Sequence, residues 1–335
     1  MMKKTGNCAI AVFAVCVSLL LAFAGCNGTK GGDGSDVTVP PPASSEPQEE
    51  TGNDTHTSGL LSDISDIGVD NYPSIYGSTA NLPLMVKLYS EICGVPEEDA
   101  AEAMAGAAVG TSDAWWSMFL RREPGEPGGL LIVYEAPENI KNQIEDEGIR
   151  LEIEPVGRDG LVFLVNRENK VNDLSTKQLQ DIYTGKVTDW KDIGGEAGPI
   201  VAYQRNENSG SHTLFLKLLM KGLEPMEAPG ELVSGMEGLV TAVAEFDGAG
   251  DAIGYSVFYY ADMMYANPDV KLLSVDGVMP SNETIASGAY PFVNDFYVVI
   301  HADEPEGSPA RILRDWLLTD KGAELMRSAN YVPIR

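Results

Sequence analysis

The sequence predicts an α/β fold with mostly parallel sheets. From residue 72 onward, short apolar runs bounded by turn residues alternate with segments of helical periodicity. Such alternation is typical of strand–helix–strand units, whose strands pair in parallel. The chain has 335 residues, of which 44% are hydrophobic, so it can bury the core of one large or two smaller domains.

The individual elements follow from the same two patterns. Apolar runs between turn residues are expected to be strands, and they cover residues 130–137, 160–166, 200–205, 252–260, 270–277 and 296–301. Segments of helical periodicity are expected to be helices, and they cover residues 82–94, 112–122, 138–148, 176–185, 214–222 and 310–329.

Residues 1–25 are expected to be a lipoprotein signal peptide rather than part of the fold. Lys3 and Lys4 precede a short apolar run that ends at Cys26, as in a secretory signal. The stretch FAGC resembles a bacterial lipobox, in which the cysteine is lipidated, although Phe23 stands where leucine is usual. The alternative is an ordinary cleaved signal. A lipobox implies an exported protein that is anchored by lipid to the outer face of the cell membrane.

Residues 26–70 are expected to be a disordered tether. They are rich in Gly, Ser, Asp, Pro and Glu, and they offer too little apolar surface to form a core. A flexible chain of this length has a reach of roughly 35–40 Å, which is enough to hold a domain clear of a membrane.

The charge of the chain excludes two classes of partner. Fifty acidic and 23 basic side chains give a formal net charge of −27. Nucleic acids and anionic lipid surfaces both require a cationic face, so neither is an expected ligand.

Four turns, each followed by a helical segment, indicate an anion site. They cover residues 76–89, 109–119, 134–144 and 205–218. The first N–H groups of a helix lack partners and carry partial positive charge, so they can bind an oxyanion. Each turn taken alone is better explained as a helix cap. Arg205 favours the anion site, because its guanidinium precedes the Ser-Gly-Ser turn at 209–211 and suits bidentate contact with an oxyanion.

The sequence gives little support to the hypothesis that the protein is an enzyme. It contains three histidines and no HExxH, GxSxG, CxxC or GxxxxGKS pattern. We therefore expect no catalytic residue, no metal site and no cofactor.

The chain resembles the phosphate-binding subunits of ABC transporters, which have the type II periplasmic-binding-protein fold. The resemblance rests on YGSTANLP (76–83), EAP (135–137), LSTKQLQDIYTGKVTDWKDIGG (174–195) and YQRNENSGSHT (203–213). It implies two α/β lobes joined by crossovers near 155–160 and 288–294. Lobe I would comprise residues 71–157 and 291–335, and lobe II residues 158–290. It also implies a monomer that closes on its ligand and docks on an ABC permease.

The resemblance further implies roles at matching positions. Arg205, Ser209, Gly210 and Ser211 fall on the family's anion loop, with Ser211 in place of the usual threonine, and Glu207 falls where an acidic residue orients the arginine. The other loops that are expected to bind the ligand supply Ser78, Thr79, Ala80, Thr111 and Ser112.

Glu135 falls where the family has an aspartate before Ala-Pro, which implies a place in the ligand site. Phosphate near neutral pH retains a proton and can donate a hydrogen bond to a carboxylate, whereas sulfate cannot. A carboxylate in the pocket would therefore favour phosphate over sulfate. The alternative is a surface glutamate at the start of the helix at 138–148.

The resulting hypothesis is an extracytoplasmic lipoprotein that captures inorganic phosphate for an ABC importer. Two alternatives stay open. The ligand could be another oxyanion or a small anionic metabolite, or the protein could be a sensory or adhesion protein on the same fold without a permease.

Overall fold

The computed structural model describes residues 60–119, 128–228, 235–245 and 251–335. The expected signal peptide, Cys26 and most of the expected tether lie outside the described residues.

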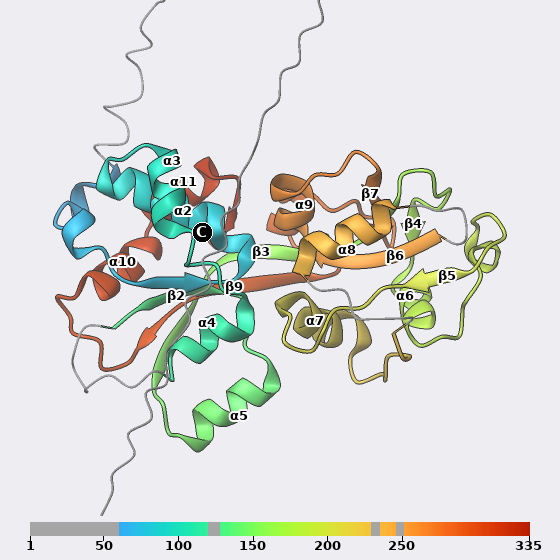
Figure 1. Cartoon of the computed structure of the whole chain (residues 1–335), viewed down its shortest axis with the longest axis horizontal. Coiled ribbons are helices and arrows are strands. Elements are labelled where there is room, and N and C mark those ends of the chain that lie inside the picture. The colour runs from blue at the N-terminus through green and yellow to red at the C-terminus, as the bar shows by residue number, and fades with distance from the viewer. Residues whose placement is uncertain (1–59, 120–127, 229–234, 246–250) are drawn as a thin grey trace, which may run out of the picture. The chain divides into compact units, whose positions relative to one another are not determined.

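The described residues form a mixed α/β unit, which confirms the fold class (Figure 1). The strands are β1 (Ile75–Gly77), β2 (Leu130–Val133), β3 (Leu151–Asn166), β4 (Asp173–Leu174), β5 (Ile200–Ala202), β6 (Asp251–Val257), β7 (Val270–Leu272), β8 (Ser274–Val275), β9 (Val293–His301) and β10 (Val332–Pro333). The α-helices are α2 (Leu82–Cys93), α3 (Glu97–Met104), α4 (Thr111–Ser117), α5 (Glu138–Asp146), α6 (Thr176–Tyr183), α7 (Gly210–Leu214), α8 (Gly235–Ala244), α9 (Asn282–Ala286), α10 (Pro309–Leu317) and α11 (Asp320–Ser328).

Several short helices of other types complete the described elements. The 3-10 helices are η1 (Ser62–Ile64), η2 (Val69–Asn71), η3 (Thr79–Asn81) and η4 (Trp190–Ile193), and the π-helices are η5 (Phe215–Met220) and η6 (Tyr259–Met264).

The main sheet has the strand order β1-β2-β9-β3-β6-β5. The pairs β1–β2, β5–β6 and, in a separate small sheet, β4–β8 are parallel. The pairs that involve β3 and β9 are antiparallel, so antiparallel pairing is more extensive among the described strands than the sequence implies.

Strand β3 changes partner along its length. Its first part pairs with β9 up to Gly160, and from Leu161 it pairs with β6. At the change, the amide of Leu161 donates to the carbonyl of Phe292, directly before β9. One continuous strand therefore joins the half of the sheet that contains β1 and β2 to the half that contains β5 and β6.

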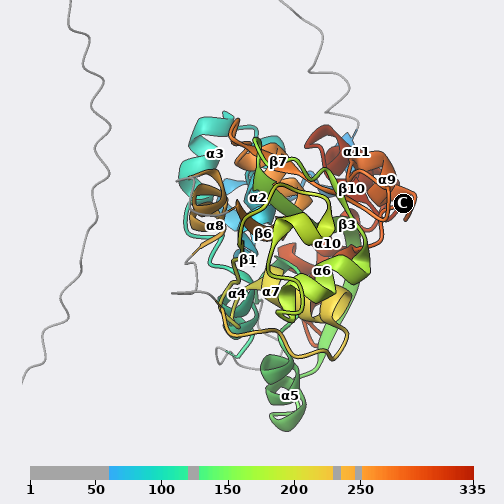
Figure 2. The ribbon, with the colours of Figure 1, turned by 90° about the vertical axis from the view of Figure 1, so that its right-hand side faces the viewer.

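Helices cover both faces of the sheet. Along β2, Leu130 and Ile132 belong to one hydrophobic cluster, whereas Leu131 and Val133 belong to another that includes Trp115 of α4. Successive strand residues point to opposite faces, so both faces of β2 are buried. In Figure 1, α2 and α11 lie on one side of β2 and β9, and α4 lies on the other. Helix α5 lies at the periphery in both Figure 1 and Figure 2.

The folded part begins before the boundary that composition suggests. Residues 60–70, assigned above to the tether, include η1 and bury Ile64 and Ile67 to 2% and 4% exposure. The expectation of disorder up to residue 70 was therefore wrong for these residues. Polar neighbours lowered the average hydropathy of the segment, but two well-spaced isoleucines suffice to dock it on the core.

Other boundaries also differ from the expected ones. The strand expected at 252–260 ends at Val257 and is followed by η6, and the helix expected at 310–329 is two helices. The expected helix is divided at Thr319, because the side chain of Thr319 caps the start of α11.

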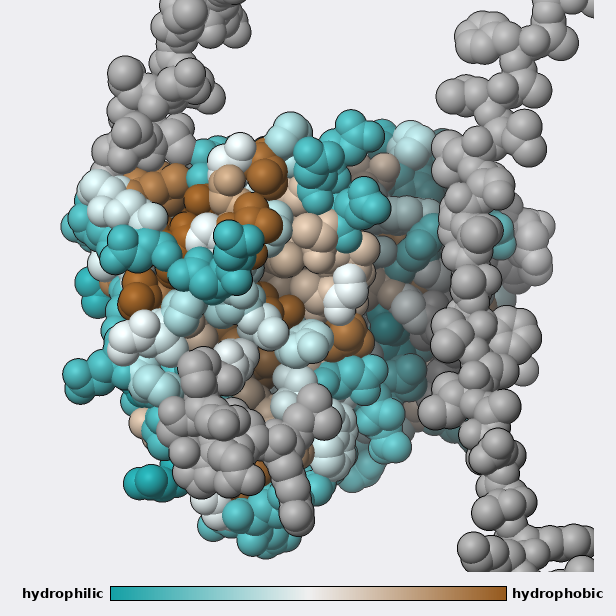
Figure 3. Space-filling model, turned by 60° about the vertical axis from the view of Figure 1, so that its left-hand side comes forward, coloured by the Kyte–Doolittle hydropathy of each residue, from teal (hydrophilic) through white to brown (hydrophobic). Residues whose placement is uncertain are grey.

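The surface in Figure 3 is mixed, with hydrophobic residues gathered toward the upper left among hydrophilic ones. Among the described residues, no helix combines the length and the hydropathy that a membrane span requires.

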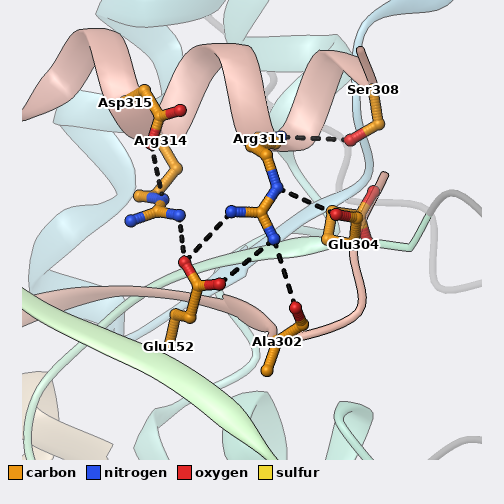
Figure 4. Close-up of polar contacts among 7 residues, drawn as sticks. All are labelled: Glu152, Ala302, Glu304, Ser308, Arg311, Arg314 and Asp315. Carbon is orange, nitrogen blue, oxygen red and sulfur yellow. Dashed lines mark hydrogen bonds and ion pairs between the residues drawn. The ribbon is translucent and has the colours of Figure 1, made fainter. Parts of the chain in front are cut away.

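An ion-pair network joins α10 to β3 (Figure 4). The carboxylate of Glu152 accepts from both terminal nitrogens of Arg311, at 3.1 and 3.2 Å, and from Arg314. Hydrogen bonds from Arg311, the charges of both arginines and a hydrogen bond from Arg314 hold the pKa of Glu152 below its ordinary value, although burial acts to raise it. The bidentate geometry makes this network stronger than a typical surface ion pair.

Glu152→Gln is expected to lower the free energy of unfolding by about 1–2 kcal/mol, because the two arginines lose their shared carboxylate. Denaturant unfolding at neutral pH measures the effect. Glu154→Gln, an exposed change in the same strand, is the control and should be near neutral. Equal stability of the two variants would contradict a structural role for the network.

Candidate functional site

A cavity of about 510 Å³ is lined by loops that converge from distant parts of the chain. It contains most of the residues that the sequence assigned to a ligand site, namely Ser78, Thr79, Thr111, Ser112, Arg205, Ser209, Gly210 and Ser211. Three helix starts meet there, at η3, α4 and α7. Their free N–H groups make this end of the cavity a good environment for an anion.

The first two loops are held together by hydroxyl groups. The Oγ of Ser78 lies 2.8 Å from the Oγ1 of Thr111, and it accepts from the backbone N–H of Tyr134 at 3.1 Å. Gly110 precedes α4 with a φ of +96°, which favours glycine. Local backbone geometry and these two hydrogen bonds therefore place Ser78 and Thr111 side by side.

The loop at 205–211 packs against the other two. The Oγ of Ser112 donates to the carbonyl of Asn208 at 2.7 Å, and the hydroxyls of Ser209 and Ser211 lie 2.9 Å apart. Gly210 is so close to Thr111 that a Cβ at this position would lie 2.2 Å from the Oγ1 of Thr111. Only glycine permits this approach.

Arg205 is the distinctive feature of the cavity. It is 8% exposed, and its Nε and one terminal nitrogen are buried without a hydrogen-bond partner among the described residues. Burial lowers its pKa, because the charged guanidinium has lost water. A buried cation without a carboxylate is costly, so the site is suited to an anionic ligand that supplies the missing acceptor atoms.

Tyr255 of β6 fixes the backbone at Arg205. Its hydroxyl accepts from the N–H of Arg205 at 3.0 Å and lies 2.8 Å from the Nδ1 of His212. Its ring stacks on Phe215, with ring centroids 4.5 Å apart. The start of α7 and the arginine are thereby held by one buried aromatic residue.

Tyr134 connects the cavity to the middle of β3. It lines the cavity, and its hydroxyl donates to the Oδ2 of Asp159 at 2.6 Å. The other oxygen of Asp159 accepts from the N–H groups of Gly160 and Tyr259. Asp159 thus joins the segment after β2 to the start of η6, next to the point where β3 changes partner.

Asp159 is expected to give the protein a measurable pH dependence. Desolvation raises its pKa to about 6, despite four hydrogen bonds that lower it. Because the folded pKa lies above the unfolded one, this group's contribution to stability is full below about pH 4 and is lost as the pH rises through 6.

The free energy of unfolding of the wild type, relative to Asp159→Asn, should therefore rise by roughly 1 kcal/mol between pH 7 and pH 5. Urea unfolding of both proteins across this range measures the difference, and the comparison cancels other titrating groups. If the difference in the free energy of unfolding does not change with pH, the pKa of Asp159 is not raised in the folded protein.

Three residues that the sequence assigned to the ligand site do not line the cavity. Ala80 is fully buried in the core, where its carbonyl accepts from the hydroxyl of Tyr331. Glu207 is exposed and forms no ion pair with Arg205. Glu135 binds Lys141 and Lys217 and lines a neighbouring hollow together with Glu207. Tyr134, the residue before Glu135, lines the cavity instead.

The sequence analysis also missed part of the lining. Gly110, Asp113, Tyr134, Asn206, Asn208, Gly235, Met236, Glu237, Val257 and Tyr260 were not assigned to the site. Asp113 and Asn208 adjoin predicted site residues and could have been included on that ground. Met236 and Glu237 lie at the start of α8, directly after Ser234 and Gly235 in the sequence. This Ser-Gly pair ahead of a helical run resembles the other turns and could have indicated them.

Metal binding has no visible support in the described residues, which contain no cluster of three or more His, Cys, Asp and Glu side chains suited to an ion.

The chain is similar to known proteins. Residues 138–319, more than half of the chain, match the family described as PBP superfamily domain. The chain is 34% identical over 174 residues to the phosphate-binding protein PstS of Bacillus subtilis, which is 50% of this chain and 55% of that protein. It is 24% identical over 269 residues to PstS of Staphylococcus aureus, covering 76% of each. The chain spans little more than half the length of several of these relatives.

Solved structures share the fold. A substrate-binding protein from Clostridium perfringens, solved with bound phosphate, aligns with a TM-score of 0.59 and 24% sequence identity, covering 79% of this chain and 100% of that one. The similarity shows that the chain has the fold of type II periplasmic binding proteins.

Proposed function

The chain belongs to the PBP superfamily, and we propose that it captures inorganic phosphate for an ABC importer. The observation that carries this proposal is the buried guanidinium of Arg205, which faces the helix starts at Thr111 and Gly210 and has no acidic partner among the described residues. A tetrahedral oxyanion supplies acceptors to the arginine, to the serine and threonine hydroxyls and to the free N–H groups together. The names of the relatives support phosphate within the oxyanions.

The negative charge of the whole chain does not oppose this function. Charges on the outer surface are screened within about 8–10 Å in physiological salt. The arginine and the amides act at contact distance in a largely buried site, where screening is weak. The local groups therefore determine binding.

We propose that the carboxylates of Asp113 and Glu237, and not that of Glu135, select phosphate over sulfate. Asp113 and Glu237 line the cavity. A carboxylate can accept the proton of hydrogen phosphate but meets only repulsion from sulfate, which has no proton to donate.

The remaining parts of the proposal concern the cell. Residues 71–157 with 291–335 and residues 158–290 act as two lobes that close on phosphate, and the change of partner along β3 supports this division. Cys26 carries a lipid that anchors the exported monomer to the outer face of the membrane, where the closed form docks on a permease. Genes for a permease and an ATPase beside this one would favour import over a sensory role.

Calorimetric titration with phosphate, sulfate and molybdate tests the proposal. We expect phosphate to bind at one site per chain and more tightly than sulfate. Failure of phosphate to release heat or to raise the melting temperature would exclude the function. If molybdate or sulfate binds more tightly than phosphate, the cavity is an anion site but phosphate is not its preferred ligand.

A further inference from the structure

Glu135 lies between two lysines that come from different parts of the chain. Lys141, on α5 and six residues away, binds its Oε1 at 2.7 Å. Lys217, on η5 and 82 residues away, binds its Oε2. Lys217 also lies 3.3 Å from the Oδ1 of Asn294. The carboxylate thus has one local partner and one partner from the segment that carries Arg205.

Both ends of the Glu135–Lys217 pair are joined closely to the cavity. Glu135 directly follows Tyr134, which lines the cavity. Lys217 lies on η5, which continues α7 without a break from Gly210. The pair therefore joins the segment of Arg205 and Gly210 to the segment of Tyr134, although neither charged group lines the cavity. Tyr134 is bonded in turn to the other two loops, since its N–H donates to the Oγ of Ser78 and its carbonyl accepts from Trp115 of α4.

We propose that Glu135 and Lys217 form a latch that holds the arginine loop against the loops of Ser78 and Thr111. They are positioning residues and do not contact the ligand. The proposal rests on the proposed function for its effect on phosphate binding, but the latch itself is a property of the ligand-free chain.

The surroundings of the pair favour a measurable contribution. The side chain of Glu135 is 19% exposed, so it is shielded from water more than most ion-paired carboxylates on a surface. Burial acts to raise its pKa, yet hydrogen bonds and charge from Lys141 and Lys217 lower the pKa overall. When the segments separate, Glu135 keeps Lys141 and loses only Lys217. The latch therefore favours the closed arrangement, and in the open one Glu135 stays paired while Lys217, whose side chain is 45% exposed, is solvated.

Lys217→Met and Lys141→Met are a matched pair of variants, since each removes one lysine from the same carboxylate. In hydrogen–deuterium exchange of the ligand-free chain, Lys217→Met should speed exchange several-fold in residues 109–117 and 205–217. Lys141→Met should leave these segments unchanged. Equal exchange in Lys217→Met and the wild type, or equal acceleration in both variants, overturns the latch.

Phosphate binding supplies an independent second measurement. A latch worth about 1 kcal/mol predicts that Lys217→Met weakens phosphate binding roughly fivefold, mainly through faster dissociation. Adding Glu135→Gln to Lys217→Met should cause little further loss, because both changes remove the same interaction. If Glu135→Gln instead alters the preference for phosphate over sulfate and Lys217→Met does not, Glu135 contacts the ligand and the proposal is wrong.

The two readouts separate the failure of the latch from the failure of the proposed function. If the wild-type chain does not bind phosphate but exchange is faster in Lys217→Met only, the latch is supported and the proposed function is wrong. Normal phosphate binding with unchanged exchange would retain phosphate and reject the latch.

Discussion

Replacing Arg205 by alanine is expected to weaken phosphate binding by roughly 100-fold and to stabilise the ligand-free protein. The loss of affinity corresponds to about 3 kcal/mol, since a buried guanidinium makes charge-assisted hydrogen bonds to an oxyanion. The gain in stability has the same origin. The arginine is 8% exposed and has no acidic partner in the part of the chain that the structure describes, so its removal relieves a desolvated charge. Calorimetry and thermal unfolding measure the two effects.

Opposite signs for binding and stability distinguish a ligand-binding arginine from a structural one. Arg205→Lys should give intermediate affinity, because the lysine keeps the charge but loses the planar fork. Arg158→Ala is the control, since Arg158 pairs with Asp295 outside the cavity. Wild-type affinity in Arg205→Ala would remove this residue from the site and leave the proposed function without its main support.

Gly210→Ala is expected to weaken phosphate binding by at least tenfold while leaving the melting temperature nearly unchanged. The new Cβ would lie 2.2 Å from the Oγ1 and 2.9 Å from the Cβ of Thr111, so the two loops must move apart. A displacement of about 1 Å suffices to break several hydrogen bonds to one small ligand. The core residues are not affected, because the loops can separate without exposing them.

Gly307→Ala is the matched control for this variant. Gly307 has no atom within 4 Å of the position of a Cβ and needs no unusual backbone angle, so alanine should be tolerated. Titration with phosphate and thermal unfolding of both variants make the comparison. Undiminished phosphate affinity in Gly210→Ala would mean that the closeness of the two loops is not required for binding.

Much of the fold could be predicted because it depends on local patterns. The strands β2, β5 and β9 and the helices α2, α5 and α6 lie where alternation and helical periodicity place them. The first half of β3 was missed because Glu152 and Glu154 interrupt its apolar pattern. In the structure, Glu152 lies in the strand and pairs with Arg311 and Arg314, from the far end of the chain.

The candidate site was predicted only in part. Arg205 and the Ser-Gly-Ser turn were found because the residue types themselves indicate an anion-binding loop. Met236 and Glu237 were not predicted, although the Ser-Gly pair before them is a turn signal, because only the position of α8 brings them to the cavity. The pairing of Glu135 with Lys141 and Lys217 was not predicted either, because Lys217 is distant in the sequence.

By itself, the sequence determined where most of the helices and strands lie and that one arginine precedes a turn able to bind an anion. These features depend on residues a few positions apart, so the order of the side chains suffices to set them. Only the tertiary structure decided that Tyr134 faces the cavity and that Glu135 reaches Lys217, 82 residues away. The reason is geometric: neighbouring residues at a strand end point in different directions, and the partner of a charge is chosen by packing between distant segments.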